Sequence, residues 1–140
     1  AINYKTQDFA EEAKKFTDGK GVDVILDMVA GDYIQRDIEC LAEDGRIGVI
    51  ATLGGAKADI DVGMFFRKRM TLTGSTLRAR SVAVKQEIAI GLREHVWPLL
   101  DSGKVKPQIH ATCPLDKAAE AHQILETGDH IGKVVLTVEN

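Results

Sequence analysis

Helical and strand-like patterns alternate along the chain, and this alternation constrains the fold more than any other feature of the sequence. Apolar residues recur at helical spacing over residues 9–16 and 32–43, and patterns typical of buried strands follow at 22–29 and 46–52. Strands that alternate with helices predict an α/β layer fold with a mainly parallel sheet. A chain of 140 residues is long enough to form such a fold around a core.

Local signals predict where the first two helices begin and end. Asp8 and Glu11 have the spacing of a capping box, so we expect the first helix to start at Asp8. Gly19 and Gly21 are expected to end that helix, and Gly45 is expected to be the C-cap of the second.

The alternation continues in the second half of the chain. We expect one or two helical turns over 64–69, a strand over 70–76 and a long helix over 81–101 with a kink at Pro98. The inner face of that helix would carry Val84, Ile88, Leu92, Val96 and Leu99. After Gly103 we predict a strand over 107–114, a helix over 116–127 and a last strand over 133–138.

Charge, hydropathy and cysteine usage exclude several classes of protein. Lys and Arg total 18 and Asp and Glu total 21, which does not predict a nucleic-acid partner. No apolar run approaches the length that spans a bilayer, so no membrane partner is expected. With only Cys40 and Cys113 and no signal-peptide pattern, we predict a cytoplasmic location rather than a disulfide-rich secreted scaffold.

Common catalytic and metal-binding motifs are missing from the sequence. The four histidines are scattered and neither cysteine belongs to a Cys-x-x-Cys pair, so we predict no metal site. There is no Gly-x-Ser-x-Gly, no Gly-x-Gly-x-x-Gly and no Walker A motif. Gly19-Lys20-Gly21 precedes a strand rather than a helix, so it is interpreted as a turn and not as a phosphate loop. No residue is assigned as catalytic.

Ligands of open parallel sheets bind outside the carboxyl ends of the strands, which are expected here at 27–31, 51–55 and 75–78. The glycines in these turns either let the backbone approach a ligand or simply form strand-to-helix turns, and the sequence leaves both open. Asp27, Thr52 and Lys106 superficially match the phosphoacceptor set of a receiver domain. No acidic pair precedes Asp27, however, and the gap to Lys106 is too long for that fold.

Several ordered segments together resemble the zinc-independent NADPH quinone oxidoreductases, in the zeta-crystallin-like branch of the medium-chain dehydrogenase/reductase superfamily. The resemblance covers essentially the whole chain. It is carried by Ala1-Ile2-Asn3-Tyr4-Lys5 with Asp8-Phe9, Gly21 to Asp27, Gly45 to Gly55, Leu72 to Arg78, Val96 to Leu100 and His130 to Leu136.

This resemblance implies an α/β fold made of the second half of a Rossmann-type parallel sheet with flanking helices, plus a C-terminal strand-helix-strand tail. Residues 1–103 would be part of the nucleotide-binding domain, and 104–140 would complete a catalytic domain that precedes them in the family. The implied activity is that of an oxidoreductase that transfers hydride from NADPH to a quinone or enone without zinc.

The resemblance also implies which residues contact the cofactor. Tyr4 matches an aromatic position near the adenosine and its 2′-phosphate. The loop that lines the nicotinamide end corresponds to Ile50, Ala51, Thr52, Leu53 and Gly54, and the strand end at the carboxamide corresponds to Ser75, Thr76 and Leu77.

The chain opens on Ala1 without a methionine and has no counterpart of the family's glycine-rich diphosphate loop. We therefore expect the C-terminal part of a longer protein, which by itself binds NADPH weakly if at all. The alternative is a non-catalytic, truncated Rossmann module that binds little or no cofactor and self-associates. The alternating strand at 70–76 is expected at a sheet edge, which predicts a homodimer formed through that edge.

Overall fold

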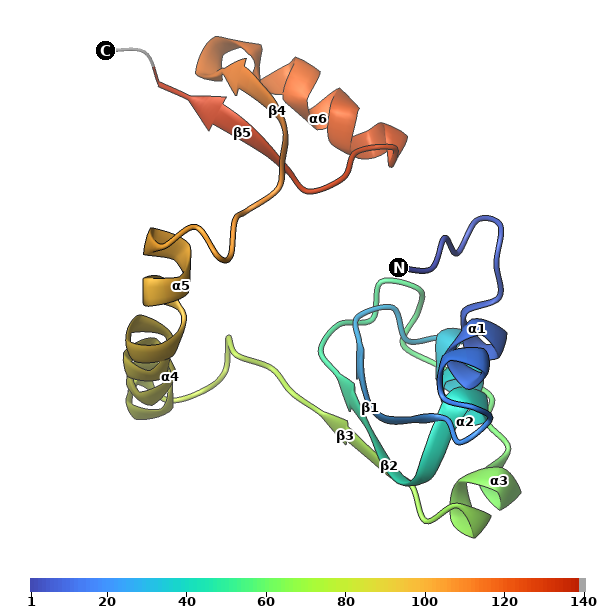
Figure 1. Ribbon diagram of the computed structural model, residues 1–140. Coiled ribbons are helices and arrows are strands. Elements are labelled where there is room, and N and C mark those ends of the chain that lie inside the picture. The colour runs from blue at the N-terminus through green and yellow to red at the C-terminus, as the bar shows by residue number, and fades with distance from the viewer. Residues whose placement is uncertain (139–140) are drawn as a thin grey trace. The chain divides into compact units, whose positions relative to one another are not determined.

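The computed structural model describes residues 1–138 and divides the chain into two compact units, Ala1–Arg80 (unit 1) and the part from Ser81 onward (unit 2). Unit 1 holds a parallel sheet with the strand order β1-β2-β3 (Figure 1). Its elements in chain order are α1 (Phe9–Phe16), β1 (Val22–Asp27), α2 (Tyr33–Cys40), β2 (Leu41–Val49), α3 (Val62–Arg67) and β3 (Thr71–Gly74).

The register of the sheet brings the carboxyl ends of its three strands to one edge. Asp27, the last residue of β1, pairs with Val49 of β2, and Val49 in turn pairs with Gly74 of β3. The turns that follow these strands therefore start side by side. This arrangement confirms the predicted α/β fold with a parallel sheet, and it places β3 at an edge of the sheet, as expected for the strand over 70–76.

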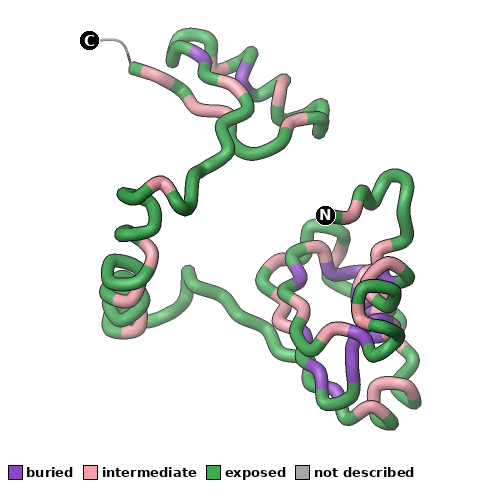
Figure 2. Tube along the Cα trace, viewed as in Figure 1, coloured by how far each residue is buried: buried purple, intermediate pink, exposed green. Residues whose placement is uncertain are grey.

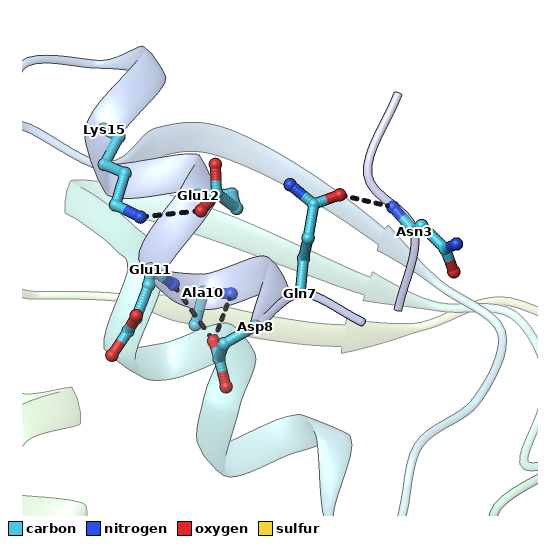
Figure 3. A network of polar contacts seen from close by, with 7 residues as sticks. All are labelled: Asn3, Gln7, Asp8, Ala10, Glu11, Glu12 and Lys15. Carbon is cyan, nitrogen blue, oxygen red and sulfur yellow. Dashed lines mark hydrogen bonds and ion pairs between the residues drawn. The ribbon is translucent and has the colours of Figure 1, made fainter. Parts of the chain in front are cut away.

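Helix α1 begins where the capping signal predicts. The Asp8 carboxylate accepts hydrogen bonds from the backbone N–H groups of Ala10, at 2.8 Å, and Glu11, at 3.1 Å (Figure 3). These bonds satisfy two amides that have no partner inside the helix. The bond from Glu11 holds the pKa of Asp8 below its usual value, and the nearby Arg36 guanidinium acts in the same direction.

Replacing Asp8 with alanine removes both capping bonds and is expected to lower the thermal midpoint of unit 1 by a few degrees. Asp8→Asn keeps an acceptor oxygen and serves as the matched control, with a smaller expected loss. Circular dichroism melts of the two variants measure the difference. Equal losses in both would show that charge, rather than capping, makes the contribution.

The core of unit 1 lies between α2 and the sheet. Ile38, Leu41 and Ile47 are fully buried, and Ala30, Ile34 and Met70 complete the cluster. Figure 2 shows this concentration of buried residues along α2 and the strands. The apolar spacing of the second helix predicts an inner face of Ile34, Ile38 and Leu41, and Ile34 and Ile38 do face the cluster from α2. Leu41 is also buried in the cluster, but it belongs to β2 and not to the helix.

The prediction that the second helix continues to Glu43 and is capped by Gly45 is wrong. Helix α2 ends at Cys40, and Leu41 already has extended backbone. Leu41 pairs with Val22, whereas the next pair joins Arg46 to Val24, so β2 carries extra residues at this point. The burial of Leu41 and its pairing with β1 stabilise the chain more than one further turn of helix α2 would. The left-handed residue in this stretch is Asp44, with φ of 59°.

The continuous apolar pattern of the first strand predicts burial on both faces, but only one face is buried. Ile25 packs against the core, but the side chains of Val24 and Leu26 point to the opposite face and are 70% and 71% exposed. The strand also ends at Asp27 rather than near Val29, and β2 ends at Val49 rather than at Thr52. Turns therefore begin earlier than predicted at the edge where the strands end.

Unit 2 contains α4 (Val82–His95), α5 (Trp97–Asp101), β4 (Ile109–Pro114), a 3₁₀ turn η1 (Leu115–Lys117), α6 (Ala118–Thr127) and β5 (Lys133–Thr137). Strands β4 and β5 pair in parallel and α6 packs on them, which is the strand-helix-strand arrangement predicted for the tail. The expected kink near Pro98 is a break at Val96 between α4 and α5. None of the residues of α4 or α5 is buried.

Candidate functional site

The turns after β1 and β2 are joined by backbone hydrogen bonds. The N–H groups of Leu53 and Gly54 donate to the carbonyl oxygens of Met28, at 3.3 Å, and Val29, at 2.6 Å. Asp27 holds the first of these turns, because its carboxylate accepts from the N–H groups of Val29 (2.7 Å) and Ala30 (2.9 Å). The loop predicted to line the nicotinamide end is thus held by the turn that follows β1.

Two glycines allow this close approach of the turns. A Cβ atom on Gly31, whose φ is +56°, would lie 2.6 Å from the Gly54 carbonyl oxygen. A Cβ on Gly54 would lie 2.9 Å from a methyl carbon of Val29 and 3.1 Å from the Val29 carbonyl oxygen. At least these two turn glycines therefore serve backbone packing between the turns, which answers part of the question that the sequence left open.

An open hollow of about 370 Å³ lies where β2 and β3 end. The Ser75 N–H donates to the Val49 carbonyl oxygen at 2.9 Å and so holds the two strand ends together. One part of the lining is apolar, and the other offers hydroxyl groups and one guanidinium. The lining residues are Val49, Ile50, Ala51, Thr52, Gly74, Ser75, Thr76 and Arg80.

Five of the nine residues predicted to contact the cofactor come together in this hollow, namely Ile50, Ala51, Thr52, Ser75 and Thr76. Leu53, Gly54 and Leu77 are not among its lining residues, although they are sequence neighbours of residues that are. Tyr4 lies in a turn before α1, where no strand forms, and is 66% exposed. The cofactor contact of each of these residues stays a prediction.

Arg80 is a lining residue that the sequence analysis missed. Arg80 lies two positions after the segment Leu72–Arg78, which carries part of the family resemblance. The residue is exposed, and its guanidinium is the cationic group of the lining. A guanidinium at the rim attracts anions and donates hydrogen bonds to carbonyl or phosphate oxygens. The sequence signal that could have identified Arg80 was a cationic residue shortly after a predicted strand end.

A second hollow, of about 240 Å³, lies beside the end of β1 and is lined in part by Asp27, Asp37, Phe9 and Tyr33. Asp37 is 4% exposed, and its Oδ2 atom has no hydrogen-bond partner among the described residues. Burial, together with the negative charge of Asp27, raises the pKa of Asp37 to about 7, against the smaller opposing effect of Arg36.

This raised pKa makes the stability of unit 1 depend on pH. In the unfolded chain Asp37 loses its proton near pH 3.8, whereas in the folded chain it keeps the proton up to about pH 7. Stability is therefore expected to fall as pH rises between these two values, because the folded state then binds more protons than the unfolded state. Urea titrations across this range measure the slope, and Asp37→Asn should remove it.

No group of three or more His, Cys, Asp or Glu side chains among residues 1–138 is placed to hold a metal ion. The same stretch contains no helix that is both long and apolar enough to cross a bilayer.

The sequence family described as zinc-binding dehydrogenase matches residues 1–136, nearly the whole chain. The chain belongs to this zinc-binding dehydrogenase family. The zinc in the family's description finds no ligand set among the described residues. Family membership confirms the resemblance drawn from the sequence segments.

Curated relatives in the zinc-binding dehydrogenase family include reductases. The 2-haloacrylate reductase of a Burkholderia species is 32% identical over 139 residues, and the human quinone oxidoreductase is 28% identical over 136 residues. Each alignment covers 96% of this chain and 40% of the relative. The chain therefore spans about two fifths of the length of these relatives.

Solved structures of similar proteins share the fold. The Escherichia coli quinone oxidoreductase, solved as a complex with NADPH, is 29% identical and superimposes with a TM-score of 0.77 over 96% of this chain and 42% of that one. A 2-haloacrylate reductase structure is 28% identical, with a TM-score of 0.73, and is matched over 43% of its length. These superpositions confirm the predicted fold class.

Proposed function

We propose that this chain supplies the nicotinamide side of an oxidoreductase that transfers hydride from NADPH to a quinone or to an activated carbon–carbon double bond. The observation that carries the proposal is the hollow at the ends of β2 and β3, which gathers five residues expected to contact the cofactor. Support for the substrate class comes from relatives that are named as quinone oxidoreductases and as a 2-haloacrylate reductase. No zinc takes part in the proposed reaction.

The lining of the hollow suits one end of a nicotinamide nucleotide. Val49, Ile50 and Ala51 offer an apolar surface against which a ring can lie, and the Ser75 and Thr76 hydroxyls can hydrogen-bond a carboxamide. A bound NADPH supplies the hydride from its nicotinamide ring, while the protein positions and orients that ring. The residues of this chain thus decide which face of the ring meets the substrate.

Tyr4 favours NADPH over NADH in this proposal, because its exposed phenol can stack on the adenine end and donate a hydrogen bond to a 2′-phosphate. By itself the chain is expected to bind NADPH weakly, since its sequence contains no glycine-rich diphosphate loop. The competing hypothesis is a non-catalytic Rossmann module without a specific cofactor site. Mapping where NADPH binds distinguishes the two hypotheses.

Titration of the isotope-labelled chain with NADPH, followed by amide NMR, tests the proposal. We expect shifts confined to Tyr4, Ile50–Gly54 and Ser75–Leu77, with a dissociation constant in the millimolar range. Signals of α6 and β5 should not move. Scattered shifts, or none at the highest concentration, would favour the non-catalytic module, and micromolar affinity would contradict the expected weak binding.

A matched pair of variants tests the hollow itself. Ala51→Trp fills the hollow with a large side chain and is expected to abolish the NADPH-dependent shifts. Ala58→Trp adds the same bulk at an exposed position of the following loop that does not line the hollow, so it should leave the shifts unchanged. If both variants or neither lose the shifts, NADPH does not bind in this hollow.

We also propose a homodimer formed through the edge strand near residues 70–76. All four residues of β3 are exposed, and its outer edge offers unpaired backbone groups to a second strand. Sedimentation velocity is expected to show a dimer that forms with increasing concentration. A monomer at the highest concentration would contradict the proposal.

A further inference from the structure

Two buried carboxyl groups lie beside the turns that build the candidate site, and the proposed reaction uses neither. Asp27 ends β1 and is 5% exposed, and Asp37 in the middle of α2 is 4% exposed. Both line the hollow of about 240 Å³ next to the end of β1. Two carboxylates that share a site repel each other, and burial strengthens this repulsion because water screens it less.

The two carboxyl groups differ in what holds them. The oxygens of Asp27 accept from the N–H groups of Val29 and Ala30, which is the pattern of a negatively charged acceptor. Asp37 has no such support at Oδ2, which is buried without a partner among the described residues. A charged oxygen in that position is costly, whereas a neutral acid group is tolerated. The arrangement therefore favours a proton on Asp37 and a negative charge on Asp27.

Asp27 is connected to the candidate site by a short series of hydrogen bonds. Its carboxylate holds the turn at Val29, and the Val29 carbonyl oxygen accepts from the Gly54 N–H at 2.6 Å. The backbone carbonyl oxygen of Asp27 accepts from the Ile50 N–H at 2.8 Å. The loop over residues 50–54 is thus bonded directly to Asp27 at Ile50 and indirectly, through Val29, at Gly54, and Ile50 lines the hollow at the ends of β2 and β3.

We propose that Asp37 is a positioning residue for the cofactor loop: protonated, it leaves Asp27 free to hold residues 50–54, and its deprotonation weakens that hold. This inference rests on the proposed function only for the identity of the loop's ligand. The proton-dependent order of the loop is a property of unit 1 by itself, so the two can fail separately.

Two further ionisable groups of α2, Arg36 and Cys40, interact electrostatically with Asp37. Arg36, on the same helix, attracts a charge on Asp37, but its guanidinium also donates to the Asp8 carboxylate at 3.2 Å and lies over the Phe9 ring at 4.2 Å. Cys40, one turn further along, donates its thiol hydrogen to the Asp37 carbonyl oxygen. Burial and then the charge of Asp37 raise the pKa of that thiol.

Two lysines from outside α2 affect the pKa of the Cys40 thiol. Lys14 of α1 and Lys68, just after α3, each lower the pKa of the Cys40 thiol against the effects of burial and Asp37. The Lys68 ammonium donates to the Leu41 carbonyl oxygen at 2.8 Å. Arg36 is the cation that opposes the raised pKa of Asp37, and its effect is smaller than those of burial and Asp27.

Amide hydrogen exchange of the whole chain, without cofactor, tests the inference. In the wild type, the protection factors of the Val29, Ala30 and Gly54 amides should fall roughly tenfold between about pH 6 and pH 8, after correction for intrinsic exchange. Asp37→Asn keeps the shape without the charge, so its protection factors should be the same at both pH values. The Ile47 amide, in the core, reports global opening and serves as the internal reference.

A second measurement needs no variant and settles the case in which Asp37→Asn does not fold. The carboxyl carbon of Asp37, observed by NMR in the wild type, should titrate near neutral pH together with the amide shifts of Val29 and Gly54. Titration near the value of an ordinary aspartate would overturn the inference, as would unchanged protection of the turn amides. Adding NADPH at both pH values tests the proposed function separately, since only that step involves the cofactor.

Discussion

Replacing Gly21 with alanine is expected to destabilise unit 1 by about 2–5 kcal/mol, from left-handed backbone and overpacking together. Gly21 has a φ of +88°, and a Cβ atom there would lie 2.6 Å from the Cys40 carbonyl oxygen and 2.8 Å from the Ala42 nitrogen. Both neighbours are backbone atoms at the point where α2 passes into β2. Relief would have to shift Leu41 and with it the core.

Gly19 provides a matched control two residues earlier in the same turn. Its φ is +83°, but a Cβ atom there would meet nothing within 4 Å. Gly19→Ala should therefore cost only the backbone part, about 1–2 kcal/mol. Urea unfolding monitored by the amide NMR signals of residues 1–80 compares the two. Equal losses would show that the close approach to Cys40 contributes nothing.

Truncating Ile38 to alanine is expected to cost about 2–5 kcal/mol, because the buried side chain loses its contacts and leaves a cavity. Ile38 is fully buried, in a cluster of only six buried side chains. A core this small has few other residues to compensate, so unit 1 of this variant is expected to be partly unfolded at room temperature.

Val24 supplies the control for this truncation. It lies on β1 and is 70% exposed, so Val24→Ala removes methyl groups that contribute little to the core. Its expected cost is below about 1 kcal/mol, which is the range of strand propensity. The same urea titration measures both variants. A loss for Val24→Ala as large as that for Ile38→Ala would place the stabilising contacts of the sheet on its other face.

Element types were predictable from the sequence because the periodicity of apolar residues is a local signal. Asp8 as a helix cap, the parallel sheet and the strand-helix-strand tail all follow from such signals. The end of α2 was not predictable in this way, because it depends on where Leu41 pairs with Val22 across the sheet. A glycine at position 45 was the obvious local stop, and the tertiary contact prevailed over it.

The candidate site was predictable to the extent that it follows the strand ends. Ser75 and Thr52 could be placed near each other because parallel strands end at one edge, and both line the hollow. Asp37 was missed although its spacing carried a signal, since it lies between Ile34 and Ile38 on the buried face of α2. A charged residue on an apolar face is easily dismissed as a solvated edge position, and only the packing shows that it is enclosed.

The two buried cysteines allow the opening of each unit to be followed by thiol labelling. Both thiols are free and buried, with Cys40 in unit 1 and Cys113 in unit 2. Burial raises the pKa of Cys40, so a thiol reagent reacts with it chiefly when the surrounding structure opens. Each unit of the chain therefore carries one thiol whose labelling rate reports its opening. The labelling rates of the two thiols, distinguished by peptide mass, report the opening of the two halves separately in one native sample.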